Sequence, residues 1–295
     1  MVSKTGDQIW SVIPGVSYSE DTHAFIQVIE ALTGNTYYFR FPIESFSYRQ
    51  DRLEIRIEEN IFTSDFIELN IGDGGEFSMK GRIEYSGSKP FPQKVFAPGI
   101  MGWYSFVPRM ECYHGVVSMT HQLSGDLEIN GKLQRFNGGK GYIEKDWGKS
   151  MPSDWVWMQS NHFLNSENSS FMLSVARIPW GKGFFPGFLS FLYVEGEVFR
   201  FATYNGSKIS NISVSDKEIA IEVHNRKHKL KISAIPNRAG MLKAPRHGNM
   251  DREIFESLNS KLNIELSGSK GKHIFKSEGI YAGLEVVGDI SKYIT

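Results

Sequence analysis

Short segments in which apolar and polar residues alternate follow one another along most of the chain. Alternation with a period of two is typical of a half-buried β-strand, whereas an amphipathic helix would repeat every three or four residues. The segment 254–266 fits both spacings, and we interpret it as a strand. The pattern predicts further strands at 24–31, 37–41, 53–57, 66–71, 127–129, 133–136, 191–194, 198–201, 219–223 and 229–232.

Turn signals separate these segments and indicate how they pair. Asn130-Gly131 lies between two apolar segments and supplies the positive φ angles that a two-residue hairpin turn requires. Glu195-Gly196 repeats the arrangement, and residues 32–36 form a longer polar connection. Few helical patterns remain. The sequence therefore predicts an all-β protein built of antiparallel barrels or sandwiches.

No Pro/Ser-rich linker divides the 295 residues, so a domain boundary must be sought in a turn. The best candidate is the Gly/Ser/Pro segment 148–153. Division there gives an N-terminal domain of residues 1–150 and a C-terminal domain of residues 151–295, each of a size common for a β-barrel domain.

The predicted boundary falls inside the stretch that is richest in candidate chemistry, residues 141–163. Before the break, Tyr142, Glu144 and Asp146 share one face of a strand, because side chains alternate between faces. After it, one face carries Trp155, Trp157, Gln159 and Asn161, and His162 lies on the other. Acids beside large aromatic residues suggest a polar group set in an apolar cavity. The alternative is that the tryptophans are core and the carboxylates face solvent.

Composition narrows the class of protein. The 33 basic and 33 acidic residues cancel, which argues against a general nucleic-acid binder, since such a protein needs a basic surplus. The single cysteine, Cys112, excludes an internal disulfide and a cysteine-cluster metal site. No apolar run reaches the roughly 18 residues expected of a spanning helix, and the first residues lack a signal-peptide core. We therefore expect a cytoplasmic protein.

A second dense segment, residues 98–115, contains Trp103, Glu111, Tyr113 and His114. His114 could act as an acid or base, although a single strand histidine is more often structural. Nucleophile elbows, phosphate-binding loops and His-Glu-x-x-His motifs are missing from the sequence.

Both segments lie within longer stretches, Pro98–His121 and Gly138–Phe163, that closely resemble the tocopherol cyclase family. The resemblance extends over nearly the whole chain. The matching motifs include Ile13-Pro14-Gly15, His23-Ala24-Phe25-Ile26-Gln27-Val28-Ile29, Gly99-Ile100-Met101-Gly102-Trp103-Tyr104, Met110-Glu111-Cys112-Tyr113-His114-Gly115, Ile178-Pro179-Trp180, Phe201-Ala202-Thr203-Tyr204 and Ala282-Gly283-Leu284-Glu285.

The resemblance implies two lipocalin-like β domains and an isomerase or lyase that closes a chromanol ring on a prenylated hydroquinone. A proton adds to the alkene nearest the ring, and a phenolic oxygen captures the resulting cation. Neither a cofactor nor a metal is implied. The family pattern continues upstream with a Gly-Trp-Tyr motif, which predicts that the N-terminal domain here lacks its first strand.

Residue chemistry then suggests roles within such a reaction. Asp146 is the first choice for the proton donor and Glu144 the second, because burial against aromatic residues keeps a carboxyl protonated. His162 or His114 would accept the phenolic proton. The remaining candidates would bind the substrate: Trp147, Trp155 and Trp157 as a cation-stabilising wall, Gln159 and Asn161 at its hydroxyls, and Tyr142, Trp103, Glu111 and Tyr113 around them.

Two other classes of protein remain compatible with the sequence. A lipocalin-like carrier would bind a prenyl or other hydrophobic small molecule and return it unchanged. A structural protein would use the aromatics as core alone. An apolar substrate would require transient contact with a membrane, which would make the protein peripheral to that membrane, although no amphipathic anchor helix is evident. The sequence does not specify an oligomeric state.

Overall fold

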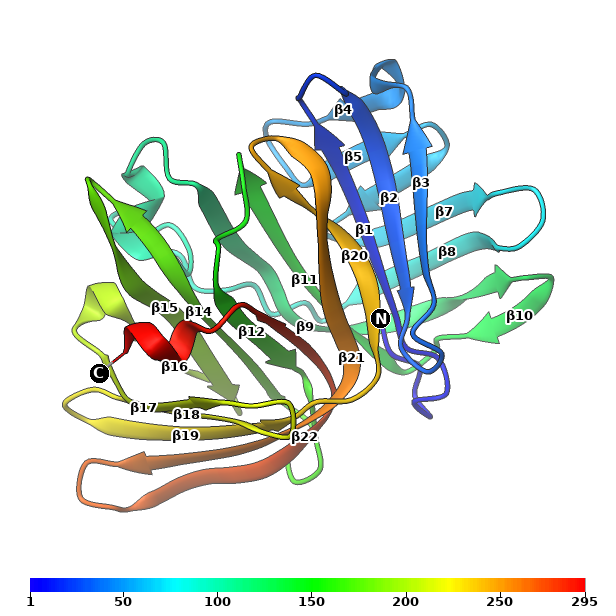
Figure 1. Ribbon diagram of the computed structural model, residues 1–295. Helices are drawn as coiled ribbons and strands as arrows, with labels where there is room; N and C mark the ends of the chain where they lie inside the picture. Colours follow the sequence, from blue (N-terminus) through cyan, green and yellow to red (C-terminus); the bar gives the residue numbers. More distant parts are fainter. Residues whose placement is uncertain (295) are drawn as a thin grey trace.

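The computed structural model describes residues 1–294, and this part of the chain is built of β-strands with four short 3-10 turns and no α-helix (Figure 1). The strands form three antiparallel sheets. The prediction of an all-β, antiparallel architecture is therefore confirmed. No helix in residues 1–294 has the length and apolarity needed to cross a bilayer.

The N-terminal half contains two of the sheets. A three-stranded sheet joins β1 (Trp10–Ser17), β2 (His23–Glu30) and β3 (Thr36–Phe41) in sequence order. An eight-stranded sheet follows, in which β11 pairs with β9. Its strands are β4 (Phe46–Tyr48), β5 (Glu54–Ile57), β6 (Asn60–Thr63), β7 (Phe66–Gly72), β8 (Ser78–Ser86), β9 (Cys112–Ile129), β10 (Lys132–Arg135) and β11 (Gly139–Gly148).

The C-terminal half is one strongly curved sheet of eleven strands. Its members are β12 (Trp155–Ser160), β13 (His162–Phe163), β14 (Ser169–Trp180), β15 (Gly183–Val194), β16 (Glu197–Ala202), β17 (Lys208–Val214), β18 (Ile219–His224), β19 (His228–Ile235), β20 (Ala239–Arg246), β21 (Asn249–Gly268) and β22 (His273–Val287). The ambiguous segment 254–266 lies within β21, so its interpretation as a strand is confirmed.

The hairpin turns form where the sequence predicts them. Asn130 and Gly131 have φ angles of 51° and 74°, and they join β9 to β10. Both values lie in the left-handed region that a type I′ turn requires. Glu195 and Gly196 likewise have positive φ, and they join β15 to β16.

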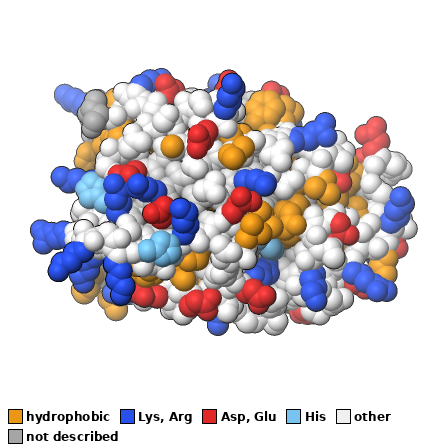
Figure 2. All heavy atoms as spheres, turned by 90° about the horizontal axis from the view of Figure 1, so that it is seen from below, with side chains coloured by type: hydrophobic (Ala, Val, Ile, Leu, Met, Phe, Trp, Pro, Cys, Tyr) orange, Lys and Arg blue, Asp and Glu red, His pale blue; other side chains and the backbone are white. Residues whose placement is uncertain are grey.

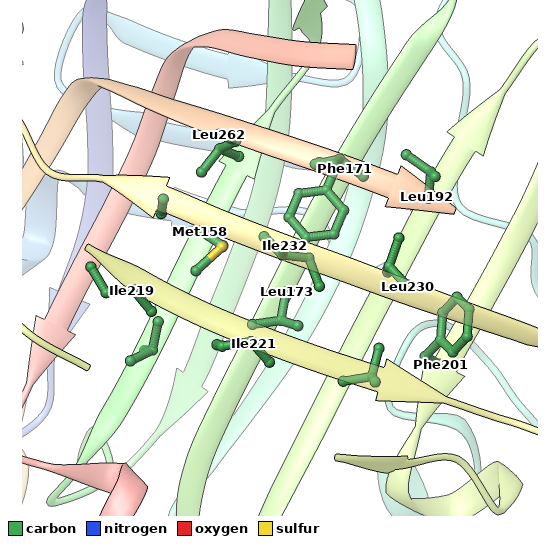
Figure 3. Packing of buried hydrophobic residues seen from close by; sticks show 14 of the residues in the cluster. Met158, Phe171, Leu173, Leu192, Phe201, Ile219, Ile221, Leu230, Ile232 and Leu262 are labelled. Atoms are coloured by element: carbon green, nitrogen blue, oxygen red, sulfur yellow. The ribbon is translucent and has the colours of Figure 1, made fainter. Parts of the chain in front are cut away.

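Each half has its own apolar core. The inner face of the C-terminal sheet gathers side chains from both of its layers, and Figure 3 shows Phe171 and Leu173 packing against Ile221, Ile232 and Leu262. A separate core fills the N-terminal half around Phe77, Met79 and Ile83. Two such cores support the lipocalin-like description of each half.

The C-terminal strands also reach across to the N-terminal half. The first part of the long strand β21 pairs with β20, and these two strands lie beside β1 and β2 (Figure 1). Gln27 of β2 fixes the contact, because its side-chain amide donates to the carbonyl of Lys243 and accepts from the Lys243 N–H, at 2.9 and 2.8 Å. The division at residues 150 and 151 therefore stays a prediction.

The lower face of the C-terminal sheet carries both basic and acidic side chains. Cross-strand ion pairs join Lys229 to Glu222 and Lys276 to Glu265 on this sheet. Figure 2 views the molecule from below and shows Lys and Arg interspersed with Asp and Glu. Such pairs are typical of a solvated surface and add little stability.

Candidate functional site

A histidine and two carboxylates meet where β9 and β11 pair. His114 and Asp146 are direct cross-strand partners, so both side chains lie on the same face of the sheet. Nδ1 of His114 lies 2.8 Å from Oδ1 of Asp146, and Nε2 lies 3.5 Å from Oε2 of Glu144. Glu144 stands two residues before Asp146 and therefore shares its face. The predicted acid pair thus lies on the two sides of one imidazole.

A β-bulge shapes this end of β11. The pairing register with β9 shifts between Gly141 and Glu144, and bulges commonly re-aim side chains near active sites. The Tyr142 hydroxyl donates a hydrogen bond of 2.7 Å to Oε2 of Glu144. Burial raises the pKa of Glu144 to about 7, although His114, Tyr142 and Trp157 favour its charged form. Glu144 can therefore hold a proton close to neutral pH.

The charge of His114 depends on these carboxylates. Burial disfavours the imidazolium, but Asp146 and Glu144 outweigh that effect and raise the pKa of His114 to about 9. The donor atoms of His114, Glu144 and Asp146 lie within 4.8 Å of one another, which is also a spacing that a divalent cation could bridge. Because a metal ligand must be a neutral imidazole, any such ion would compete with the proton on His114.

The C-terminal sheet brings a second row of side chains to the same region. Trp157 of β12 is the cross-strand partner of Glu285 on β22, and Glu285 is the partner of Glu256 on β21. Direct partners in an antiparallel sheet point to the same side. The indole N–H of Trp155 donates to Oε2 of Glu285 at 2.7 Å. The row therefore consists of two aromatic residues beside two carboxyl groups.

The two carboxyls of this row influence each other and Glu144. Burial raises the pKa of Glu285 to about 7, against the lowering effect of the Trp155 hydrogen bond, and Glu144 adds to the increase. Burial, Glu285 and Glu144 together raise the pKa of Glu256 well above its usual range. Since like charges this close oppose each other, one proton is retained by the pair of Glu256 and Glu285 near neutral pH.

A glycine makes room for the ring of Trp157. A Cβ atom on Gly283 would lie 2.6 Å from Cζ3 of Trp157, closer than two carbons can approach. The absence of a side chain at Gly283 leaves the space that the indole of Trp157 occupies against β22. Any larger residue at this position would move the ring.

Three buried donors around the cluster make no hydrogen bond among the described residues: Nε1 of Trp157, Nε2 of Gln159, and Nε2 of His114, which has only the 3.5 Å ion pair with Glu144. Trp157 lowers the pKa of Glu144, yet no hydrogen bond of normal geometry joins them. Unpartnered buried donors are rare in native proteins and cost stability. Their presence beside carboxyls indicates a place for a ligand that carries acceptor oxygens.

Apolar side chains enclose this polar group at the junction of the two halves. One cluster joins Val116 and Met119 of β9 to Met172 and Phe191 of the C-terminal sheet, with Trp157 packed against it. A second cluster contains Trp155. Trp155 is buried and Trp157 is partly buried, so both contribute to the junction.

Several predicted site residues lie away from the cluster. Trp147 is half exposed and stacks on Tyr113 with ring centroids 5.4 Å apart, on the opposite face of β11 from Asp146. The Tyr113 hydroxyl donates to the carbonyl of Val107. Trp103 lies on the short turn η2 (Gly102–Phe106) and is also half exposed.

The other three members of the predicted set also have different surroundings. Asn161 donates to the carbonyl of Gly141 at 2.8 Å and thereby links β11 to the end of β12. His162 packs edge-on against Tyr281, and burial lowers its pKa to about 3. Burial raises the pKa of Glu111, and His247, Arg177 and Arg252 partly offset that effect. The structure does not bring any of these three to His114.

Sequence reasoning missed Glu256 and Glu285. Glu285 ends a segment that the family resemblance includes, which was the available signal. The sequence signal for Glu256 was weaker: it is an acid on the same strand face as the apolar residues Ile254 and Leu258. Only the register between β21 and β22 places the two carboxyls side by side.

A hollow elsewhere on the C-terminal sheet, of about 740 Å³, does not offer comparable chemistry. It is lined by alternating charges on neighbouring strands, among them Glu222, Lys231, Glu265 and Lys276. Glu222 and Glu265 are already paired with lysines. We therefore place the candidate site at the junction of the two halves.

Comparison with known proteins shows which family the chain resembles. The model of the tocopherol cyclase-like family matches residues 85–288. This span includes His114, Glu144, Asp146, Trp155, Trp157, Glu256 and Glu285. A probable tocopherol cyclase of the chloroplast from Oryza sativa subsp. japonica is 25% identical over 205 residues, which cover 63% of this chain and 42% of that protein. The chloroplastic tocopherol cyclase of Zea mays is 24% identical over 197 residues, covering 63% of this chain and 41% of that protein.

The fold has a counterpart among solved structures. An AttH-type protein from Nitrosomonas europaea superposes with a TM-score of 0.52 at 14% identity, over 96% of this chain and 88% of the other. That likeness concerns the fold alone. The chain spans about two fifths of the length of the plant relatives, and the family match covers more than half of its own residues. The chain belongs to the tocopherol cyclase-like family.

Proposed function

We propose that the protein closes a chromanol ring on a prenylated hydroquinone at the junction of its two halves. The observation that carries this proposal is the set of donors that make no hydrogen bond among the described residues, His114 Nε2, Trp157 Nε1 and Gln159 Nε2, beside carboxyls that can hold a proton. A hydroquinone offers oxygen acceptors to these donors, and its prenyl chain suits the apolar clusters around them.

Glu144 is the proton donor in this proposal, and Asp146 positions His114. Burial raises the pKa of Glu144 to about 7, so a substantial fraction of this carboxyl carries a proton near neutral pH. As its proton moves to the alkene, the developing carboxylate meets the His114 imidazolium and the Tyr142 hydroxyl, 3.5 and 2.7 Å from Oε2. Donors arranged for a charge that forms during the reaction stabilise the transition state more than the ground state.

Trp157 and Trp155 would stabilise the tertiary cation. Indole faces attract positive charge, most strongly where water is excluded. Trp157 links the proposed donor to Glu285, since it affects the pKa of Glu144 and is the cross-strand partner of Glu285. Gly283 leaves the space that this ring occupies.

Glu285 is the acceptor of the phenolic proton. His114 cannot serve, because its raised pKa keeps it protonated. The Trp155 N–H stabilises the charged form of Glu285, and Glu256, whose pKa is higher, retains the proton of the pair. General bases act best when their pKa lies near the working pH, as it does here.

The proposed step balances without any other reactant. A C–H bond forms with the proton of Glu144, a C–O bond forms between the phenolic oxygen and the tertiary carbon, and the phenolic proton passes to Glu285. The product is an isomer of the substrate. Return of the proton from Glu285 to Glu144 through solvent restores the starting state.

The direct test incubates the protein with a panel of prenylated hydroquinones and analyses the products by mass and ultraviolet spectra. A product of unchanged mass with a chromanol spectrum supports the proposal, and turnover should persist in the presence of a chelator. Ligand that binds and returns unchanged would instead identify a carrier.

A further inference from the structure

Exposed aromatic side chains from two distant segments gather at one edge of the molecule. The turn η2 exposes 46% of Trp103 and 61% of Phe106, and the hairpin tip between β14 and β15 exposes 46% of Trp180. Soluble surfaces expose single apolar residues routinely, but a group of large aromatic residues marks an interaction site.

Ring contacts hold the two segments together. The ring of Tyr104 in η2 lies 4.2 Å from that of Trp103 and 6.1 Å from that of Trp180, measured between centroids. Phe185 of the hairpin contacts both Tyr104 and Trp180. Figure 1 shows the short η2 turn beside the tip of this hairpin. Phe184 contacts Tyr293 on the other face of the hairpin, so we call the three exposed residues Trp103, Phe106 and Trp180 the aromatic edge.

Two basic residues adjoin the aromatic edge in sequence: Arg109 follows η2, and Lys182 lies in the turn between β14 and β15. Aromatic rings beside lysine and arginine are the combination that favours the interface of an anionic bilayer.

The aromatic edge is tied directly to the candidate site. The backbone N–H of His114 donates to Sδ of Met101, immediately before η2, at 3.1 Å. The Tyr113 hydroxyl donates to the carbonyl of Val107, immediately after η2, at 2.6 Å. Any partner bound to the aromatic edge would therefore lie next to β9, the strand that carries His114.

We propose that the aromatic edge docks onto the surface of a membrane rich in anionic lipid, with its rings inserted at headgroup level. The inference extends the proposed function, because a prenylated substrate dissolves in the bilayer and would reach the site from the docked edge. Binding to lipid does not require turnover, so the two proposals can fail separately.

The experiment is co-sedimentation with vesicles of phosphatidylglycerol and phosphatidylcholine, compared with vesicles of phosphatidylcholine alone. The wild-type chain should bind the anionic vesicles more strongly. The double variant Phe106→Ser/Trp180→Ser should bind at least about tenfold more weakly, since each ring loses buried apolar area. Lys182→Glu should weaken binding to anionic vesicles by about fivefold.

A matched control replaces exposed apolar residues away from the aromatic edge, Tyr48→Ser/Leu133→Ser, whose side chains are similarly exposed. That variant should bind as the wild type does. Equal binding of the wild type and Phe106→Ser/Trp180→Ser would overturn the proposal. So would a wild-type dimer in light scattering that this variant converts to a monomer, because the edge would then serve a second copy of the chain.

Discussion

The Asp146 carboxylate lies 2.8 Å from Nδ1 of His114, its direct partner on the neighbouring strand. This pair fixes the imidazole so that its other nitrogen faces Glu144. Because the carboxylates raise the pKa of His114 to about 9, the imidazole is charged at neutral pH. In the proposed reaction, Asp146 therefore acts through His114, and Glu144 delivers the proton.

Asp146→Asn should lower the pKa of His114, and nuclear magnetic resonance titration of the imidazole would measure it. A raised histidine pKa contributes stability that is fully present below the unfolded pKa, about 6.5, and is lost as the pH rises through about 9. The difference in melting temperature between wild type and Asp146→Asn should thus be larger at pH 6 than at pH 9.5. An unchanged His114 titration would show that Asp146 does not hold the charge.

Trp155→Phe keeps an aromatic ring but removes the N–H that donates to Glu285. The charged form of Glu285 then loses a hydrogen bond, so the pKa of Glu285 should rise above about 7. Because turnover needs an ionised Glu285, the acid limb of the rate profile should move to higher pH. Trp180→Phe is the matched control, and the same displacement in that variant would count against the role of Glu285.

Gly283→Ala should displace the Trp157 ring, because the added Cβ would lie 2.6 Å from Cζ3. We expect turnover to fall at least about tenfold, since a misplaced wall stabilises the cation less, and the tryptophan fluorescence to move to longer wavelength. Gly75→Ala is the control, because a Cβ there meets nothing within 4 Å. Normal turnover in Gly283→Ala would mean that the position of this ring is not critical.

Glu256→Gln should stabilise the protein as the pH rises. Burial and the neighbouring Glu285 and Glu144 raise the pKa of Glu256, while the amino group of Met1 favours its charge. A raised carboxyl pKa means that the folded state binds more protons, so the wild type loses stability as the pH climbs from about 4.5. The melting temperature of Glu256→Gln relative to wild type should be higher at pH 8 than at pH 5, and a constant difference would refute this.

The fold could be predicted because its signals are local. Alternation within each strand and the positive-φ turn at Asn130-Gly131 depend on neighbouring residues only, and the strands formed as expected. The strand faces of Glu144, Asp146, Trp155 and Trp157 follow from the same period of two.

The rest of the site depends on contacts between distant segments. Glu256 and Glu285 are neighbours through strand register, and His114 meets Asp146 across thirty-two positions of the chain. The position of Trp147 on the opposite face follows instead from the local period of two, because Trp147 is next to Asp146 in sequence. The sequence could therefore identify the region of the site but not the second carboxyl pair.

The central claim is that Glu144 delivers the proton, and the most direct measurement is the turnover of Glu144→Gln beside Asp146→Asn on the substrate that the panel identifies. General acid catalysis contributes about 10²–10⁴-fold. We predict that Glu144→Gln loses at least about a hundredfold in kcat, that its substrate affinity stays within about threefold of wild type, and that Asp146→Asn retains more activity. Near-normal turnover in Glu144→Gln, with Asp146→Asn inactive and still folded, would contradict the account and make Asp146 the acid.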